Sequence, residues 1–114
     1  MLTMYAIPNC DTVKKARTFL DKKGIAYEFV DFKKTPPTSD LVKKWADFAG
    51  DLPVNKKGTT YKKLKDEFET LSAAKKIDFI TKNSSMIKRP VLENKNKTLA
   101  IGFDEETYSG LKIG

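Results

Sequence analysis

The sequence contains no histidine and a single cysteine, and these two scarcities exclude several kinds of chemistry. Without histidine, neither a Ser-His-Asp triad nor a Cys-His nucleophile pair can be assembled. One cysteine without histidine cannot make a zinc site, so we expect no metal centre. A lone cysteine also excludes an internal disulfide, which is typical of a cytoplasmic protein. Any disulfide that Cys10 forms must therefore be made with another molecule.

Long hydrophobic runs are missing as well. No apolar segment approaches the ~18 residues that a membrane-spanning helix needs. The N-terminus lacks the basic, apolar and small-residue segments of a signal peptide. We therefore expect no signal peptide and no contact with a membrane. The 114 residues suffice for one domain with one hydrophobic core, so a single domain over residues 1–114 is predicted.

Arginine is scarce although the chain is basic. The net charge is +7, and of the 22 basic residues only Arg17 and Arg89 are arginines. The lysines occur in pairs spread over the whole chain, which favours a solvated basic surface over a nucleic-acid interface, where charge is concentrated and arginine reads the bases. We expect no direct nucleic-acid contact. The alternative role of this charge is to attract anionic ligands, such as glutathione or an acidic partner protein.

The first 32 residues have the pattern of a β-α-β unit. Residues 2–7 are short and apolar, as in a buried strand, and residues 26–32 alternate as a second strand does. Between them, residues 11–23 carry an apolar face typical of an amphipathic helix, and Gly24 provides its stop. A crossover of this kind predicts two parallel strands and a right-handed connection.

A helical insertion is predicted at about residues 38–83. Thr38 or Ser39 caps its first helix, which Gly50 ends. The apolar face of this helix is expected to contain Leu41, Val42, Trp45, Phe48 and Ala49. A second helical stretch starts at Thr59, and Ser72 caps a third helix over residues 73–82, with Ile77 and Ile80 facing inward.

The last part of the chain predicts a hairpin and a short helix. Residues 90–93 and 98–102 form the two strands around a turn at 94–96. Asp104 caps a helix that runs through Tyr108 and Leu111. A β-α-β unit followed by a ββα unit is the layout of an α/β, thioredoxin-like fold with a mixed four-stranded sheet.

Cys10 lies between the end of a strand and the start of a helix. The first N–H groups of a helix lack intrahelical partners, and the helix dipole adds positive charge there, so both favour a thiolate. Lys14, one turn further on, adds a positive charge. Thr12 can donate its hydroxyl to the sulfur, whereas the negative charge of Asp11 opposes ionisation. The alternative is a buried, inert cysteine that only packs.

Arg89-Pro90 is the second candidate position. In thioredoxin-like domains a cis-proline commonly opens the third strand and faces the cysteine, although cis X-Pro bonds are a minority in general. Arg89 would then lie beside the site as a planar anion-binding group. The alternative is a surface arginine that pairs with a carboxylate.

Four motifs resemble the arsenate reductase-like family (ArsC/Spx/YffB), most of all its small YffB-type branch. The resemblance rests on residues 5–17 (YAIPNCDTVKKAR), 58–61 (GTTY), 87–92 (IKRPVL) and 102–103 (GF), and it spans essentially the whole chain in order. It implies a thioredoxin-like fold with inserted helices. It also implies an oxidoreductase whose Cys10 is the nucleophile in glutathione-dependent thiol chemistry.

The same resemblance supplies the expected site residues. Glutaredoxin-linked arsenate reductases use three arginines: Arg89 matches one, Asn55 lies near the position of another, and Gly102 replaces the third. These departures count against arsenate reduction itself. Around the thiolate or an oxyanion we expect Asp11, Thr12, Val13, Lys14 and Arg89. For substrate or glutathione we expect Asn9, Asn55, Lys56, Lys57, Arg89 and Pro90.

The family also implies partners. Glutathione is the expected co-substrate, with no bound cofactor, and glutathione or a glutaredoxin-type protein is the expected reductant of a monomeric enzyme. The alternative is a transcription regulator or adaptor of the Spx kind that binds RNA polymerase. Spx proteins commonly carry a Cys-x-x-Cys switch, and Val13 occupies the position of the second cysteine here.

Overall fold

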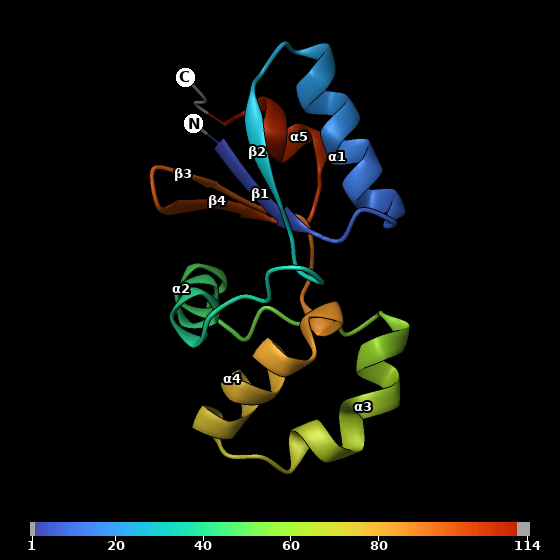
Figure 1. Ribbon diagram of the computed structural model, residues 1–114, viewed down its shortest axis with the longest axis vertical. Helices are drawn as coiled ribbons and strands as arrows, with labels where there is room; N and C mark the ends of the chain where they lie inside the picture. The colour runs from blue at the N-terminus through green and yellow to red at the C-terminus, as the bar shows by residue number, and fades with distance from the viewer. Residues whose placement is uncertain (1, 112–114) are drawn as a thin grey trace. The chain divides into compact units, whose positions relative to one another are not determined.

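The computed structural model describes residues 2–111, and its contacts divide the chain into two compact units (Figure 1). The first unit contains the described residues up to Phe32 and from Arg89 onward, and the second contains Lys33–Lys88. The predicted helical insertion thus falls within the second unit. No helix among residues 2–111 is long and apolar enough to cross a membrane.

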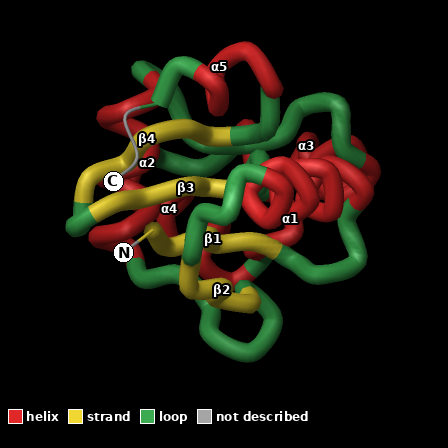
Figure 2. Tube along the Cα trace, turned by 90° about the horizontal axis from the view of Figure 1, so that it is seen from above, coloured by secondary structure: helices red, strands yellow, loops and turns green. Residues whose placement is uncertain are grey.

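The first unit is built on a mixed sheet of four strands in the order β2-β1-β3-β4 (Figure 2). The strands are β1 (Leu2–Ala6), β2 (Tyr27–Asp31), β3 (Val91–Asn94) and β4 (Lys97–Ile101). Strand β1 is parallel to β2 and antiparallel to β3, and β3 is antiparallel to β4. The predicted thioredoxin-like α/β fold, with its mixed four-stranded sheet, is confirmed.

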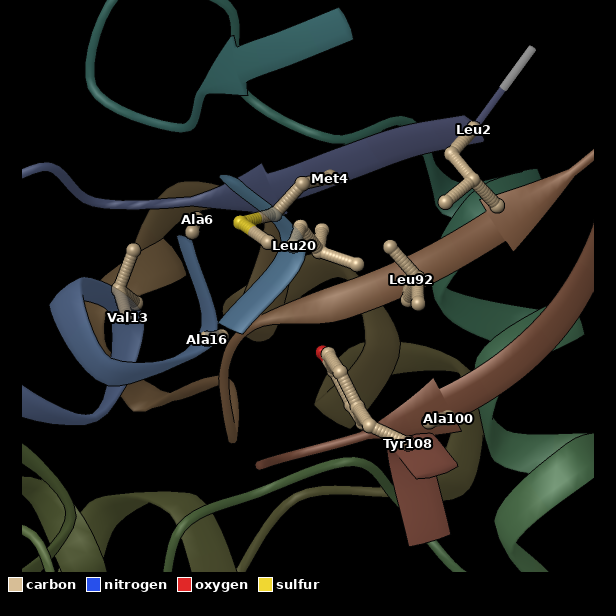
Figure 3. Packing of buried hydrophobic residues seen from close by; sticks show 9 residues of the cluster. All are labelled: Leu2, Met4, Ala6, Val13, Ala16, Leu20, Leu92, Ala100 and Tyr108. Atoms are coloured by element: carbon tan, nitrogen blue, oxygen red, sulfur yellow. The ribbon is translucent and has the colours of Figure 1, made fainter. Parts of the chain in front are cut away.

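Two helices pack on one face of this sheet, α1 (Asp11–Lys22) and α5 (Glu105–Ser109). The apolar stripe of α1 and the buried side chains of the strands form one cluster with Tyr108 of α5 (Figure 3). Its members from α1 are Val13, Ala16 and Leu20, which are all fully buried. Burying a side chain such as Leu20 contributes about 1.5–3 kcal/mol, so this cluster anchors the start of α1 to the sheet.

Helix α1 stops where the sequence predicts, and the physical reason is local. Gly24 has a φ of +68°, a left-handed conformation that favours glycine. Its N–H donates to the carbonyl of Asp21 at 3.1 Å, and the N–H of Ile25 donates to the carbonyl of Leu20 at 3.0 Å. This pair of hydrogen bonds is the Schellman motif, which turns the chain directly into β2.

The second unit contains α2 (Ser39–Ala49), α3 (Thr59–Glu69), α4 (Ala73–Lys82) and the 3-10 turn η1 (Ser84–Met86). The hydroxyl of Thr38 accepts a hydrogen bond from Leu41, so Thr38 rather than Ser39 caps α2. Ser72 caps α4 as predicted, and Gly50 ends α2 with a φ of +75°.

The expected places of three residues in the helices are wrong. Phe48 and Ala49 were expected on the apolar face of α2, but Phe48 is 51% exposed and Ala49 is exposed as well, because the buried stripe of this helix is narrow and centred on Val42 and Trp45. The last helix, which Asp104 caps as predicted, ends at Ser109, so Leu111 lies beyond it. Periodicity predicts a helical face but not how much of that face its surroundings cover.

Candidate thiol site

Cys10 is the residue that immediately precedes α1. Its backbone is extended (φ −113°, ψ 128°), which is the conformation of an N-cap residue, and its carbonyl accepts the N–H of Lys14 at 2.9 Å. The thiol is free and partly buried. The turn at residues 8–9 after β1 and the anchored stripe of α1 therefore place one accessible sulfur beside the unpaired amides of the first helical turn.

The sheet register brings Arg89 to the same place. Because β1 and β3 are antiparallel, with Tyr5 opposite Val91, the C-terminal end of β1 and the N-terminal end of β3 lie side by side at the same end of the sheet. Cys10 follows β1 closely, and Arg89 comes two residues before β3. The guanidinium of Arg89 lies close enough to the Cys10 sulfur to lower the pKa of the thiol. Two residues 79 positions apart in the chain thus meet through strand pairing.

The peptide between Arg89 and Pro90 is cis. Pro90 is buried, and its carbonyl accepts a hydrogen bond of 2.8 Å from the N–H of Gly102. Gly102 follows β4 with a φ of +87°, where glycine is favoured. This contact holds the turn before β3. Sequence reasoning missed it, because Gly102 was noted there as the end of a strand, as part of a family motif and as the replacement of an arginine, but not as a support of Pro90.

The surroundings of Cys10 favour its thiolate. Burial raises the pKa of the thiol. The backbone N–H of Val13, the charge and hydrogen bonding of Arg89 and the backbone N–H of Thr12 together lower it by more than burial raises it, so the pKa lies below the ordinary value of 9.0. The sulfur accepts no cap hydrogen bond of ordinary geometry. The two amides therefore act mainly as oriented dipoles on the charged sulfur.

The remaining residues expected around Cys10 are placed differently. Thr12 acts through its backbone N–H, and its side chain is exposed, so the expected hydroxyl contact is replaced by an amide. Asp11 lies exposed in the first turn of α1, and Asn9 is exposed in the preceding turn. Lys14 is exposed and lines a hollow along α1.

The residues expected to bind substrate near position 55 belong to the second unit. Asn55 organises the turn before α3, since its side-chain oxygen accepts the N–H of Lys57 at 3.2 Å and its carbonyl accepts the N–H of Gly58 at 3.0 Å. Lys56 lies 3.9 Å from the carboxylate of Asp51 in an exposed ion pair. The structure thus gives Asn55 a structural task, and a ligand role for these three residues stays a prediction.

The described residues contain no group of three cysteine or acidic side chains that could hold a metal ion. The site contains a free thiol, two helix amides and a guanidinium, on a thioredoxin-like sheet with a cis-proline before its third strand. The fold and the site together define a thioredoxin-like thiol protein. Comparison with known proteins narrows that class.

The ArsC family model matches residues 5–111, and the chain belongs to the ArsC family. The solved structure of the YffB protein is 36% identical and superimposes with a TM-score of 0.83 over 96% of both chains. An arsenate reductase (ArsC)-related protein of Brucella melitensis is 36% identical, with a TM-score of 0.71 over 95% of this chain and 91% of that one. The global transcriptional regulator Spx of Streptococcus mutans is 26% identical over 93% of this chain and 79% of its own.

Proposed function

We propose that the protein is a glutathione-dependent thiol-disulfide reductase of the cytoplasm with Cys10 as its nucleophile. The observation that carries the proposal is the place of the Cys10 thiol at the start of α1, beside Arg89; there the amides of Val13 and Thr12 and the guanidinium lower the pKa of the thiol. Attack on a disulfide requires the thiolate, so this environment raises the reactive fraction at neutral pH. The likeness to a protein related to arsenate reductases supports the same chemistry.

The reaction that we propose has two balanced steps. The Cys10 thiolate attacks the glutathione sulfur of a mixed disulfide RS–SG, so that the Cys10–SG bond forms, the old S–S bond breaks and RS⁻ leaves and takes up a proton. A glutathione thiolate then attacks Cys10–SG, which releases oxidised glutathione and restores the Cys10 thiolate. Glutathione is the reductant, and the substrate thiol is the product.

Arg89 has two tasks in this proposal. Its guanidinium stabilises the thiolate before attack and again when Cys10 leaves in the second step. Because arginine is always charged, it acts over the whole neutral pH range. The chain has no second cysteine, so the resolving thiol must come from outside, which glutathione or a glutaredoxin-type protein supplies.

The pH dependence of Cys10 alkylation by iodoacetamide tests the proposal. We expect wild type to have a midpoint below that of a free thiol and Arg89→Ala to have a higher midpoint than wild type. Arg89→Lys should lie between the two, because lysine keeps the charge but lacks the planar guanidinium. Turnover of a small glutathione mixed disulfide, measured by the release of oxidised glutathione, should fall in the same order. A wild-type midpoint at or above the ordinary thiol value, or no turnover, would overturn the proposal.

The second candidate is an adaptor that binds RNA polymerase, which the likeness to Spx favours. In this chain Val13 stands three residues after Cys10, so the contact would not depend on an internal disulfide. Capture of purified RNA polymerase by wild type and by Cys10→Ser separates the candidates. Equal capture by both, without any turnover of mixed disulfides, supports the adaptor.

A further inference from the structure

A hollow of about 370 Å³ runs along the solvent side of α1 and takes no part in the site described above. It is lined from α1 by Lys14, Lys15, Thr18, Phe19 and Lys22, and from the segment at the start of α5 by Phe103 and Glu105. All of these residues belong to the first unit. The hollow is large enough for a few side chains of a bound partner.

The floor of the hollow is aromatic and rigid. The rings of Phe19 and Phe103 lie 6.0 Å apart, and both are partly buried. Each makes an edge contact with the buried ring of Tyr108, at 5.9 Å and 4.8 Å respectively. Because Tyr108 belongs to the core cluster, the floor is held in place before any ligand arrives. A pre-formed apolar floor favours an aromatic or aliphatic side chain.

The walls of the hollow are strongly positive. Lys14, Lys15 and Lys22 contribute three ammonium groups, and among the described residues the lining holds one carboxylate, that of Glu105. The ammonium of Lys23 adds a fourth charge, since it lies 5.7 Å from the centre of the Phe19 ring. An apolar floor between cations is complementary to an apolar group flanked by carboxylates.

The hollow begins one helical turn from the reactive sulfur. Lys14 donates its backbone N–H to the carbonyl of Cys10. With a rise of 1.5 Å per residue, Lys22 lies about 18 Å along the axis from Cys10, a length that five or six residues of extended chain span. A peptide segment of this length reaches both the sulfur of Cys10 and the far lysine of the hollow.

We propose that this hollow docks an acidic segment, containing one aromatic or aliphatic residue, of the protein whose thiol exchanges with Cys10. The proposal rests on the proposed function, and it names the class of substrate: glutathionylated protein thiols in acidic surroundings. The carboxylates of the segment pair with the lysines of α1, and its apolar side chain sits on Phe19 and Phe103. Docking along α1 then presents the disulfide to the start of that helix.

Two measurements test the docking. The first is the fluorescence anisotropy of a labelled nine-residue peptide, with one phenylalanine flanked by four aspartates and a serine in place of its cysteine. The second is the turnover of the same peptide with a glutathionylated cysteine, compared with a small glutathione mixed disulfide. The variant is Lys15→Glu with Lys22→Glu, and the matched control is Lys62→Glu with Lys75→Glu, on exposed positions of the second unit.

We expect the variant to bind the serine peptide about tenfold more weakly and the control pair to bind it as wild type does, since each exposed charge pair contributes a few-fold in affinity. Replacing the phenylalanine of the peptide by serine should also weaken binding to wild type. Turnover of the acidic peptide should fall with binding, while turnover of the small mixed disulfide stays unchanged.

Three results would overturn the docking: equal weakening by the control pair, equal binding of the phenylalanine-free peptide, or equal binding of a single-stranded oligonucleotide of the same charge. The proposed function fails separately. If wild type binds the acidic serine peptide through the hollow but does not turn over the small mixed disulfide, the docking surface stands and the reductase proposal falls.

Discussion

Helices α1 and α4 start in different ways. Helix α4 begins at Ser72, whose hydroxyl accepts a hydrogen bond from the N–H of Lys75. Helix α1 begins at Cys10, which makes no such bond, and the amides of its first turn lower the pKa of the thiol instead. The same helical position thus caps the helix where a hydroxyl occupies it and lowers the pKa of the side chain where a thiol does.

The largest expected effect comes from giving α1 the kind of N-cap residue that α4 has. Cys10→Ser should abolish disulfide exchange, because an oxygen cannot take the place of the sulfur in a mixed disulfide. It should also raise the free energy of unfolding by about 0.5–1 kcal/mol, because serine is a preferred N-cap residue. Exchange assays and urea denaturation measure the two effects. A variant that loses exchange without gaining stability would show that the cap position of α1 is not equivalent to that of α4.

The complementary variant, Ser72→Ala, removes the cap of α4. Loss of the cap should lower the free energy of unfolding by about 1 kcal/mol. The alkylation midpoint of Cys10 should not move, since Ser72 contributes only to its own helix. Urea denaturation and alkylation of the same preparation check both statements, and a shifted midpoint would mean that the two helix starts are coupled.

Tyr108 tests how a buried hydroxyl without a hydrogen-bond partner affects the stability of the fold. Its hydroxyl points into the aliphatic cluster (Figure 3) and has no hydrogen-bond partner among the described residues. Burial raises the pKa of this phenol far above its usual range, so the hydroxyl stays neutral. Tyr108→Phe should therefore stabilise the fold by up to about 1 kcal/mol in thermal or urea unfolding. A loss of stability would indicate that this donor, like the amides of α1, has a use.

The smallest effect is the pH dependence of stability. The pKa of Cys10 is lower in the folded chain than the ordinary value of 9.0, so the unfolded chain binds more protons between the two values. The free energy of unfolding should thus rise with pH up to about 9 and fall as the pH drops through the folded pKa. The sulfur is partly exposed, which keeps the effect small. Wild type and Cys10→Ser should differ in slope only in this window.

Local signals predicted most of the fold. Ser72, Asp104 and Gly24 act on backbone groups only a few residues away, so their roles as caps and stops can be recognised in the sequence. The width of a buried stripe depends on what packs against it, which is why Phe48 was wrongly expected to face inward. The end of the last helix before Leu111 did have a local signal, Gly110, which the helical spacing of Tyr108 and Leu111 obscured.

The candidate site divides in the same way. The position of Cys10 before a helix followed from neighbouring residues. The place of Arg89 beside it was expected only by analogy with thioredoxin-like domains and with the family, because it depends on the pairing of β1 with β3. The cis state of the Arg89–Pro90 peptide and the support from Gly102 also arise from tertiary structure. The lysines of the α1 hollow were visible in the sequence, but the pairing of Phe19 with Phe103 beneath them was not.

The start of α1 also has a consequence for the redox balance of the protein. The amides and the guanidinium stabilise the thiolate of Cys10, and they lose that interaction when the sulfur is neutral in a mixed disulfide. Stabilising the reduced form makes the oxidised form a stronger oxidant, so in the proposed reaction a glutathionyl group on Cys10 is given up readily. The mixed disulfide at Cys10 is thus expected to be a short-lived intermediate. A long-lived mixed disulfide would need a helix start that stabilises the thiolate less.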